Sequence, residues 1–140
     1  MYHLKQGRWD QLQQDAKLIR TQVFIVEQHI PEAEEWDEHD AISQHFVIYD
    51  QDQPIATARL LQNHSVGRVA VVKAYRGQGI GRMIMLEIIA YAQQQARPHL
   101  RLSSQTHAVS FYQQLGFIVQ GDEYDECGIP HIEMTMSIDR

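Results

Sequence analysis

A glycine-rich segment between two apolar stretches is the most informative feature of the sequence. It reads RVAVVKAYRGQGIGRMIMLEII and runs from Arg68 to Ile89. Glycine stands at the alternate positions 77, 79 and 81, with Arg76 and Arg82 on either side. Glycine lets the backbone turn sharply and lets another group approach it closely. Because unpaired N–H groups at the start of a helix bind anions, we expect this segment to hold a phosphate group.

The surrounding hydrophobic pattern predicts alternating strands and helices. Apolar residues recur at helical spacing over 9–28, where Asp10 is the expected N-cap, and after Ile80. A shorter helix is expected over 106–117, and the acidic stretch 31–44 is expected to be a loop. Together these elements predict one mixed α/β domain over residues 1–140. The expected strands are 2–6, 45–50, 52–62, 65–72, 99–104, 117–124 and 131–138.

The composition argues against several classes of protein. No apolar run approaches the roughly 20 residues that a membrane span requires. The N-terminus also lacks the apolar core of an export signal, so we expect a cytoplasmic protein without a membrane partner. A formal net charge of -6 argues against nucleic-acid binding, which needs a basic face. With one cysteine, Cys127, and eight dispersed histidines, no metal site is expected.

Two common phosphate-binding motifs do not match the glycine segment. A P-loop has Lys and then Ser or Thr after its last glycine, whereas Arg82 and Met83 stand here. A dinucleotide-binding motif has Gly-x-Gly-x-x-Gly and an acidic residue about 20 residues further on. The spacing here is Gly-x-Gly-x-Gly, and the next expected strand has Arg101 instead of an acid. A tight turn without a ligand is the other interpretation of the segment.

The segment resembles the acetyl-CoA-binding motif of the GNAT superfamily of N-acetyltransferases, Arg/Gln-x-x-Gly-x-Gly/Ala. Arg76, Gly79 and Gly81 occupy its defining positions. AVSFYQQLGF, from Ala108 to Phe117, is similar to a later segment of the same family. IRTQVFIVEQ near the start and GIPHIEM near the end resemble the ElaA-like branch. The resemblance covers nearly the whole chain and implies a GNAT-like α/β fold, with a mixed central sheet of about six or seven strands and about four helices.

The resemblance also implies where acetyl-CoA binds. In the family, the strand before the glycine segment is splayed from its neighbour, and its free backbone groups bind the pantetheine arm and the thioester oxygen. Here these groups belong to Val69, Ala70 and Val71, and an N–H near Val71 is the candidate oxyanion donor. Gln105 stands where many members have an asparagine that contacts CoA. The pyrophosphate is expected beside Arg76, on the amides of Gly77, Gln78, Gly79, Ile80, Gly81 and Arg82.

Acetyl transfer to an amine also requires an acid and a base. Tyr112 matches the family's frequent general acid, and a phenol stays protonated at neutral pH. Glu27 and His131 are the two candidate bases and are also candidate substrate-binding residues. Arg20, on the same expected helix as Glu27, is a further candidate for substrate binding, and a surface salt bridge is its alternative.

Two functions remain open from the sequence. The first is an acetyl-CoA-dependent N-acetyltransferase acting on a primary amine of a small molecule or peptide. The second is a non-catalytic acyl-CoA-binding regulatory domain. Tyr112 favours the enzyme, because only catalysis needs its hydroxyl. The acidic stretch 32–40 could attract a cationic acceptor, although such runs are usually solvated loops, and a homodimer also stays open.

Overall fold

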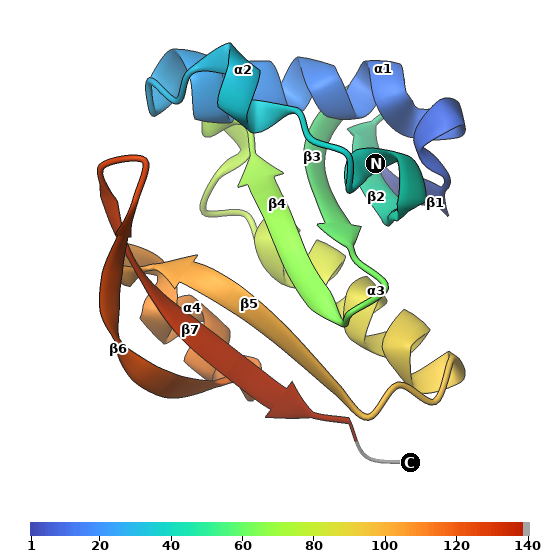
Figure 1. Cartoon of the computed structure of the whole chain (residues 1–140). Helices are drawn as coiled ribbons and strands as arrows, with labels where there is room; N and C mark the ends of the chain where they lie inside the picture. Colours follow the sequence, from blue (N-terminus) through green and yellow to red (C-terminus); the bar gives the residue numbers. More distant parts are fainter. Residues whose placement is uncertain (139–140) are drawn as a thin grey trace.

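Seven strands form one mixed sheet (Figure 1), seen in a computed structural model that describes residues 1–138. The strand order is β1-β2-β3-β4-β5-β7-β6, and every neighbouring pair is antiparallel except β4 and β5. The predicted mixed α/β architecture is confirmed. The strands are β1 (Tyr2–Gly7), β2 (Gln44–Asp50), β3 (Gln53–Leu60), β4 (Ser65–Val71), β5 (His99–Gln105), β6 (Ile118–Glu126) and β7 (Ile129–Ser137).

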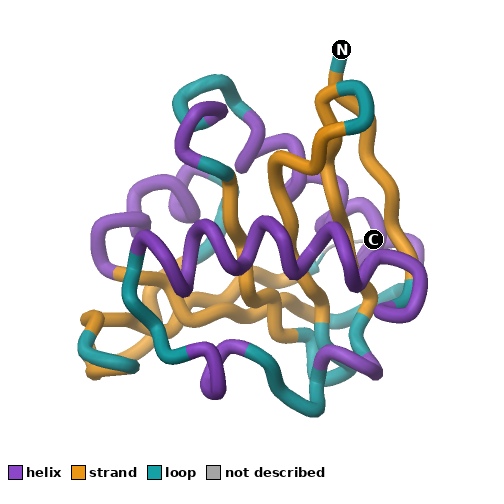
Figure 2. Tube along the Cα trace, turned by 90° about the horizontal axis from the view of Figure 1, so that it is seen from above, coloured by secondary structure: helices purple, strands orange, loops and turns teal. Residues whose placement is uncertain are grey.

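Helices cover both faces of the central strands. Nearly all residues of β2 and β3 are buried, although successive side chains of a strand point to opposite faces. Both α1 (Trp9–Arg20) and α3 (Ile80–Gln94) pack on these two strands, and α4 (Val109–Gln114) packs on β5 and β6. Figure 2 shows α1 lying across the strands, and the single turn of α2 (Glu32–Glu35) packs on the segment that follows α1.

The first predicted helix changes its geometry halfway along. After Arg20 it continues as a π-helix over Thr21–Glu27, in which the N–H of Gln28 donates to the carbonyl of Val23, five residues earlier, at 3.2 Å. Such wide turns are frequent at functional sites. The predicted N-cap, Asp10, was wrong: the cap is Arg8, whose backbone N–H donates to the side chain of Gln11.

A bulge in β4 separates this strand from β5. The two are paired only at Ser65–Arg101 and Val66–Leu102. Just beyond these pairs the register of β4 against β3 slips, and Arg68 takes a left-handed φ of 52°. An extra residue of this kind bends a strand. The two strands therefore diverge toward their C-terminal ends (Figure 1).

Part of the acidic stretch 32–40, which was expected to be solvated, belongs to a buried ion network. The expectation was wrong for Glu35 and Asp40, which are only 2% and 3% exposed. The guanidinium of Arg20 binds these carboxylates at 2.8 and 2.7 Å. The whole network consists of Arg20, Arg59, Arg68, Glu35, Asp37 and Asp40. Its three positive and three negative charges cancel, and Arg68 ties the β4 bulge to α2.

Candidate active site

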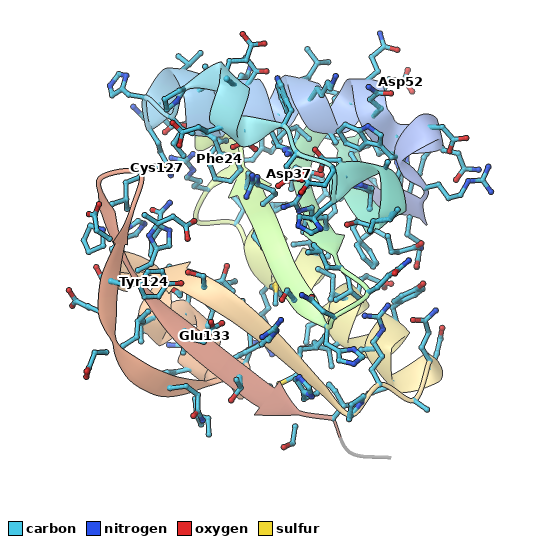
Figure 3. The ribbon with its side chains drawn as sticks, viewed as in Figure 1. Phe24, Asp37, Asp52, Tyr124, Cys127 and Glu133 are labelled. Carbon is cyan, nitrogen blue, oxygen red and sulfur yellow. The ribbon has the colours of Figure 1, made fainter. Side chains whose placement is uncertain are left out.

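A cavity of about 890 Å³ occupies the gap between β4 and β5. Phe24 of the π-helix and Cys127 at the tip of the β6–β7 hairpin, both labelled in Figure 3, belong to its walls. Most of the predicted site residues meet in this one space. The predicted residues on its walls are Val69, Ala70, Val71, Arg76, Gly77, Gly79, Ile80, Gly81, Arg82, Gln105, Tyr112 and His131.

The backbone of β4 presents hydrogen-bonding groups to the gap. The N–H of Val72 donates to the carbonyl of Ile55 in β3, at 3.0 Å. Because successive residues of a strand direct their N–H groups to opposite sides, those of Val69 and Val71 face the gap and that of Ala70 faces β3. The carbonyl of Val71 agrees with this direction, since it accepts a 2.9 Å bond from Nε of Arg76. The gap thus has free strand donors on one side.

The glycine segment forms the N-terminus of α3. Gly77 and Gly79 have φ of 79° and 81°, a conformation that other residues adopt only with strain. The first helical bond runs from the N–H of Met83 to the carbonyl of Gly79, so the preceding N–H groups have no partner within the helix. A Cβ on Gly81 would lie 3.3 Å from the ring of Phe111, so this glycine allows α3 to pack closely on α4.

The side chains of Gln78 and Gln105, two residues predicted to bind CoA, form hydrogen bonds with other residues of the protein. The side chain of Gln78 is not on the cavity wall, and its oxygen accepts a 2.7 Å bond from the hydroxyl of Tyr2 in β1. Gln105 lies on the wall, and its amide nitrogen donates to Gln28 at 2.9 Å. This bond joins the end of β5 to the π-helix across the cavity and leaves the amide oxygen of Gln105 for a ligand.

Tyr112 is a buried phenol on the cavity wall, packed between aromatic rings. Its side chain is 8% exposed and meets the rings of Phe111 and Phe117 edge-on. Burial raises the pKa of Tyr112 to about 12. Among the described residues its hydroxyl forms no hydrogen bond. A phenol in this state stays protonated at all physiological pH values and is free to donate to a ligand.

His131 is held in one tautomer. It lies in β7, opposite Gln105 of β5 and Tyr124 of β6, and is 7% exposed. Its Nδ1 is 2.7 Å from the carbonyl oxygen of Ile129. A carbonyl can only accept, so Nδ1 carries the hydrogen and Nε2 of the neutral ring is left with a lone pair.

Glu27, one of the two candidate bases, is paired with Arg76. Its two carboxylate oxygens accept 2.9 and 2.7 Å bonds from Arg76, and its side chain is not on the cavity wall. The hydrogen bonds from Arg76 hold the pKa of Glu27 below its ordinary value, which makes it a weak base. Since Arg76 also binds the carbonyl of Val71, Glu27 fixes the strand that carries the candidate oxyanion donor.

Arg20 does not reach the cavity, which contradicts its predicted role in substrate binding. Its side chain is 1% exposed, and Glu35 and Asp40 occupy its guanidinium. The alternative of a surface salt bridge was also wrong, because the pair is buried. Arg20 helps to hold α2 beside the π-helix.

Many wall residues were not predicted from the sequence, among them Phe24, Gln28, Ser103, Glu126 and Cys127. Glu34, also on the wall, belongs to the acidic stretch that was expected to attract a cationic acceptor. Glu34 and Cys127 are 93 positions apart, yet the thiol of Cys127 donates to Oε1 of Glu34 at 3.0 Å. Gly128, between the two expected C-terminal strands, is typical of a hairpin turn. The sequence gives no sign that the tip of this hairpin reaches α2.

Two negative findings concern residues 1–138. In this range no three or more His, Cys, Asp or Glu side chains are grouped to bind a metal ion. None of the helices there has the length and apolar character that crossing a membrane requires.

Comparison with known proteins identifies the same family that the sequence motifs resemble, over nearly the whole chain. The family model of the GNAT acetyltransferase domain matches residues 10–138. The YyaT protein of Bacillus subtilis is 37% identical over 132 residues, which are 90% of this chain and 89% of that protein. The crystal structure of an acyl-CoA N-acyltransferase from Pseudomonas aeruginosa superposes with a TM-score of 0.89 at 29% identity, covering 98% of this chain and 100% of that one.

The chain belongs to the GNAT family of acetyltransferases. Within the family it belongs to the ElaA-like branch, since ElaA of Escherichia coli is 32% identical over 129 residues, 86% of this chain and 84% of ElaA. The crystal structure of that ElaA has a TM-score of 0.89 over 98% of this chain and 100% of its own. The protein is thus an acyltransferase, of a class that takes its acetyl group from acetyl-CoA.

Proposed function

We propose that the protein transfers the acetyl group of acetyl-CoA directly to a primary amine of a small molecule or peptide. One observation carries the proposal: a strand donor, a protonated phenol and an imidazole with a free nitrogen share one cavity. They are the N–H of Val71, the hydroxyl of Tyr112 and Nε2 of His131, from three different elements. Direct acyl transfer to an amine needs such a donor, acid and base.

The residues of the cavity fit acetyl-CoA along its length. The N-terminus of α3, with Arg82 and the left-handed glycines, offers several N–H donors and a positive charge to a pyrophosphate. On the unpaired edge of β4, the N–H of Val69 is free for an amide of the pantetheine arm, and the N–H of Val71 is left for the thioester oxygen. When bound, acetyl-CoA supplies an activated acyl group and a thiolate leaving group.

The donor and the acid act on different atoms of the thioester. The N–H of Val71 donates to the carbonyl oxygen as this oxygen gains negative charge, and one such preorganised donor contributes about 3 kcal/mol. Tyr112 gives its proton to the departing sulfur. Burial raises the pKa of Tyr112 to about 12, so the phenol still has its proton when the sulfur leaves.

His131 is the better candidate for the base. The bond from Nδ1 to the carbonyl of Ile129 orients the ring and leaves Nε2 to accept the proton of the attacking amine. Glu27 is bound to Arg76 on both oxygens, which lowers its pKa, and its side chain is not on the cavity wall. The positions of Tyr112 and His131 in the cavity favour catalysis over the non-catalytic domain that the sequence left open.

The test is a screen of primary amines with acetyl-CoA, in which free thiol and the acetylated amine are both measured. The proposal expects equal amounts of the two products with at least one amine, and a strong loss of both with His131→Gln. Release of thiol without any acetylated amine would contradict direct transfer. If His131→Gln keeps the wild-type rate and pH profile, His131 is not the base.

A further inference from the structure

The charges of the cavity are divided between its two ends. Arg82 and the N-terminus of α3 make the glycine end positive, while Arg76 is neutralised by Glu27. At the other end, Glu34 of α2 and Glu126 of the β6–β7 hairpin stand on the walls. Cys127 links the two: its thiol donates to Oε1 of Glu34 at 3.0 Å, and Glu126 directly precedes it in the chain.

These two carboxylates have no cationic partner among residues 1–138. Arg68 is on the same wall and donates to the backbone carbonyl of Glu34 at 3.5 Å, but its charge is paired with the carboxylates of Glu35 and Asp37 within the neutral ion network. The carboxylate of Glu34 accepts only the thiol hydrogen of Cys127, and neither Glu34 nor Glu126 is in an ion pair among the described residues. The end of the cavity away from the glycines therefore has excess negative charge.

The two carboxylates stand at a built site. The side chains of Tyr112 and His131 are more than nine-tenths buried on the walls of the same cavity, and in each of them one polar atom has no partner among the described residues. Glu34 and Glu126 thus line the same cavity as the free hydroxyl of Tyr112 and the free Nε2 of His131.

An amine can attack only after it has lost its proton, so its own charge is absent when the acetyl group is transferred. Carboxylates that face the acceptor can then attract a different positive charge on the same molecule. We propose that the acceptor carries a second, non-reacting ammonium group, which Glu34 and Glu126 hold while the first amine reacts. This inference rests on the proposed N-acetyltransferase activity and names its substrate class: aliphatic diamines and similar dications.

The expected preference is moderate, because both carboxylates are at the exposed mouth of the cavity. An exposed ion pair contributes up to about 1 kcal/mol, or roughly a fivefold change in KM. Two carboxylates acting together therefore favour a diamine over the alkylamine of the same length by roughly 5- to 25-fold in kcat/KM. Added salt should reduce this preference, because it screens exposed charges.

The experiment measures kcat/KM for three acceptors of equal chain length: an α,ω-diaminoalkane, the n-alkylamine, and the ω-amino acid, which has a negative charge in place of the second amine. The wild type should prefer them in this order. In the double variant Glu34→Gln and Glu126→Gln the preference should disappear, mainly through KM of the diamine. The matched control, Glu38→Gln with Glu123→Gln, removes two charges from the same segments but away from the cavity wall and should keep the preference.

The outcomes separate this inference from the proposed function. If the alkylamine and the diamine have equal kcat/KM, or if the double variant keeps the wild-type preference, the second-cation proposal is wrong. The proposed N-acetyltransferase activity is then still supported. If no amine at all is acetylated, both proposals are wrong. A salt-sensitive diamine preference that is lost only in the double variant supports both.

Discussion

Tyr112 can be tested by removing a single oxygen atom. Tyr112→Phe keeps the ring between Phe111 and Phe117 but has no proton to give. We expect kcat to fall about 100-fold, because the acid acts in the transition state, while the affinity for CoA stays unchanged. Tyr91→Phe, in α3 and off the cavity wall, is the control and should keep the full rate. An unchanged kcat in Tyr112→Phe would remove this residue from the mechanism.

Glu27 can be distinguished from a base by its pH dependence. Glu27→Gln loses the two-bond contact with Arg76, so we expect kcat/KM to fall by about fivefold at every pH, as for an exposed ion pair. Arg76→Lys keeps the charge but cannot make the planar double contact, and it should show a similar loss. A loss in Glu27→Gln that grows steadily as the pH falls would instead identify Glu27 as the base.

Among the elements, the loop before α3 has a conformation that only glycine adopts without strain. Nothing lies within 4 Å of a Cβ built on Gly79, so its φ of 81° is the constraint rather than a close neighbour. Gly79→Ala should cost about 1–2 kcal/mol of folding free energy and should weaken CoA binding, because the loop moves away from this conformation.

Gly121 in β6 provides the matched control for this change. It has a φ of 82° and an equally open surrounding, but it is not on the cavity wall. Gly121→Ala should therefore lose similar stability in urea unfolding while CoA still binds with wild-type affinity in calorimetry. Equal CoA affinity in both variants would place the pyrophosphate elsewhere.

Local signals in the sequence were sufficient to predict most elements. The alternate glycines before an amphipathic stretch predicted the N-terminus of α3, and the AVSFYQQLGF segment predicted α4 with Tyr112. The π-helix could not be predicted in the same way, because its apolar residues keep a spacing close to that of an α-helix. Its wide turns depend on tertiary contacts that bring Phe24 and Gln28 to the cavity.

Side-chain roles that depend on distant partners were the part that the sequence could not supply. Glu27 and Arg76 are 49 positions apart, so the sequence did not show that this candidate base is paired. Arg20 seemed free for a substrate because its partners, Glu35 and Asp40, stood in a stretch that looked solvated. The sequence of an acidic stretch shows its net charge, but it does not show which of its carboxylates are paired with distant cations.

The buried ion network stabilises the folded molecule when its carboxylates are ionised, so its contribution to the free energy of folding depends on pH. Burial raises the pKa of Asp37, but the hydrogen bonds and charge of Arg59 outweigh this effect and lower it to about 2. A carboxyl whose pKa is lowered by folding stabilises the folded state above its unfolded pKa of 3.8, and this contribution is lost as the pH falls toward 2.

Asp37→Asn should therefore destabilise the protein by up to about 2 kcal/mol near neutral pH, and the difference from the wild type should shrink as the pH falls below about 4. The measurement is the free energy of unfolding in urea over a series of pH values. Asp52→Asn, in the exposed turn between β2 and β3, should change it little at any pH. A difference for Asp37→Asn that is constant with pH would contradict the lowered pKa.

Titration of the isotope-labelled protein with CoA, followed through its backbone amide signals, tests the central claim most directly. If the gap between β4 and β5 binds the cofactor, the largest changes should occur at the N–H groups of Val69, Val71 and residues 77–82. The amides of β1 and of Gly121 should change little. Changes confined to other parts of the chain, with the Val71 and 77–82 signals unmoved at saturation, would contradict the account.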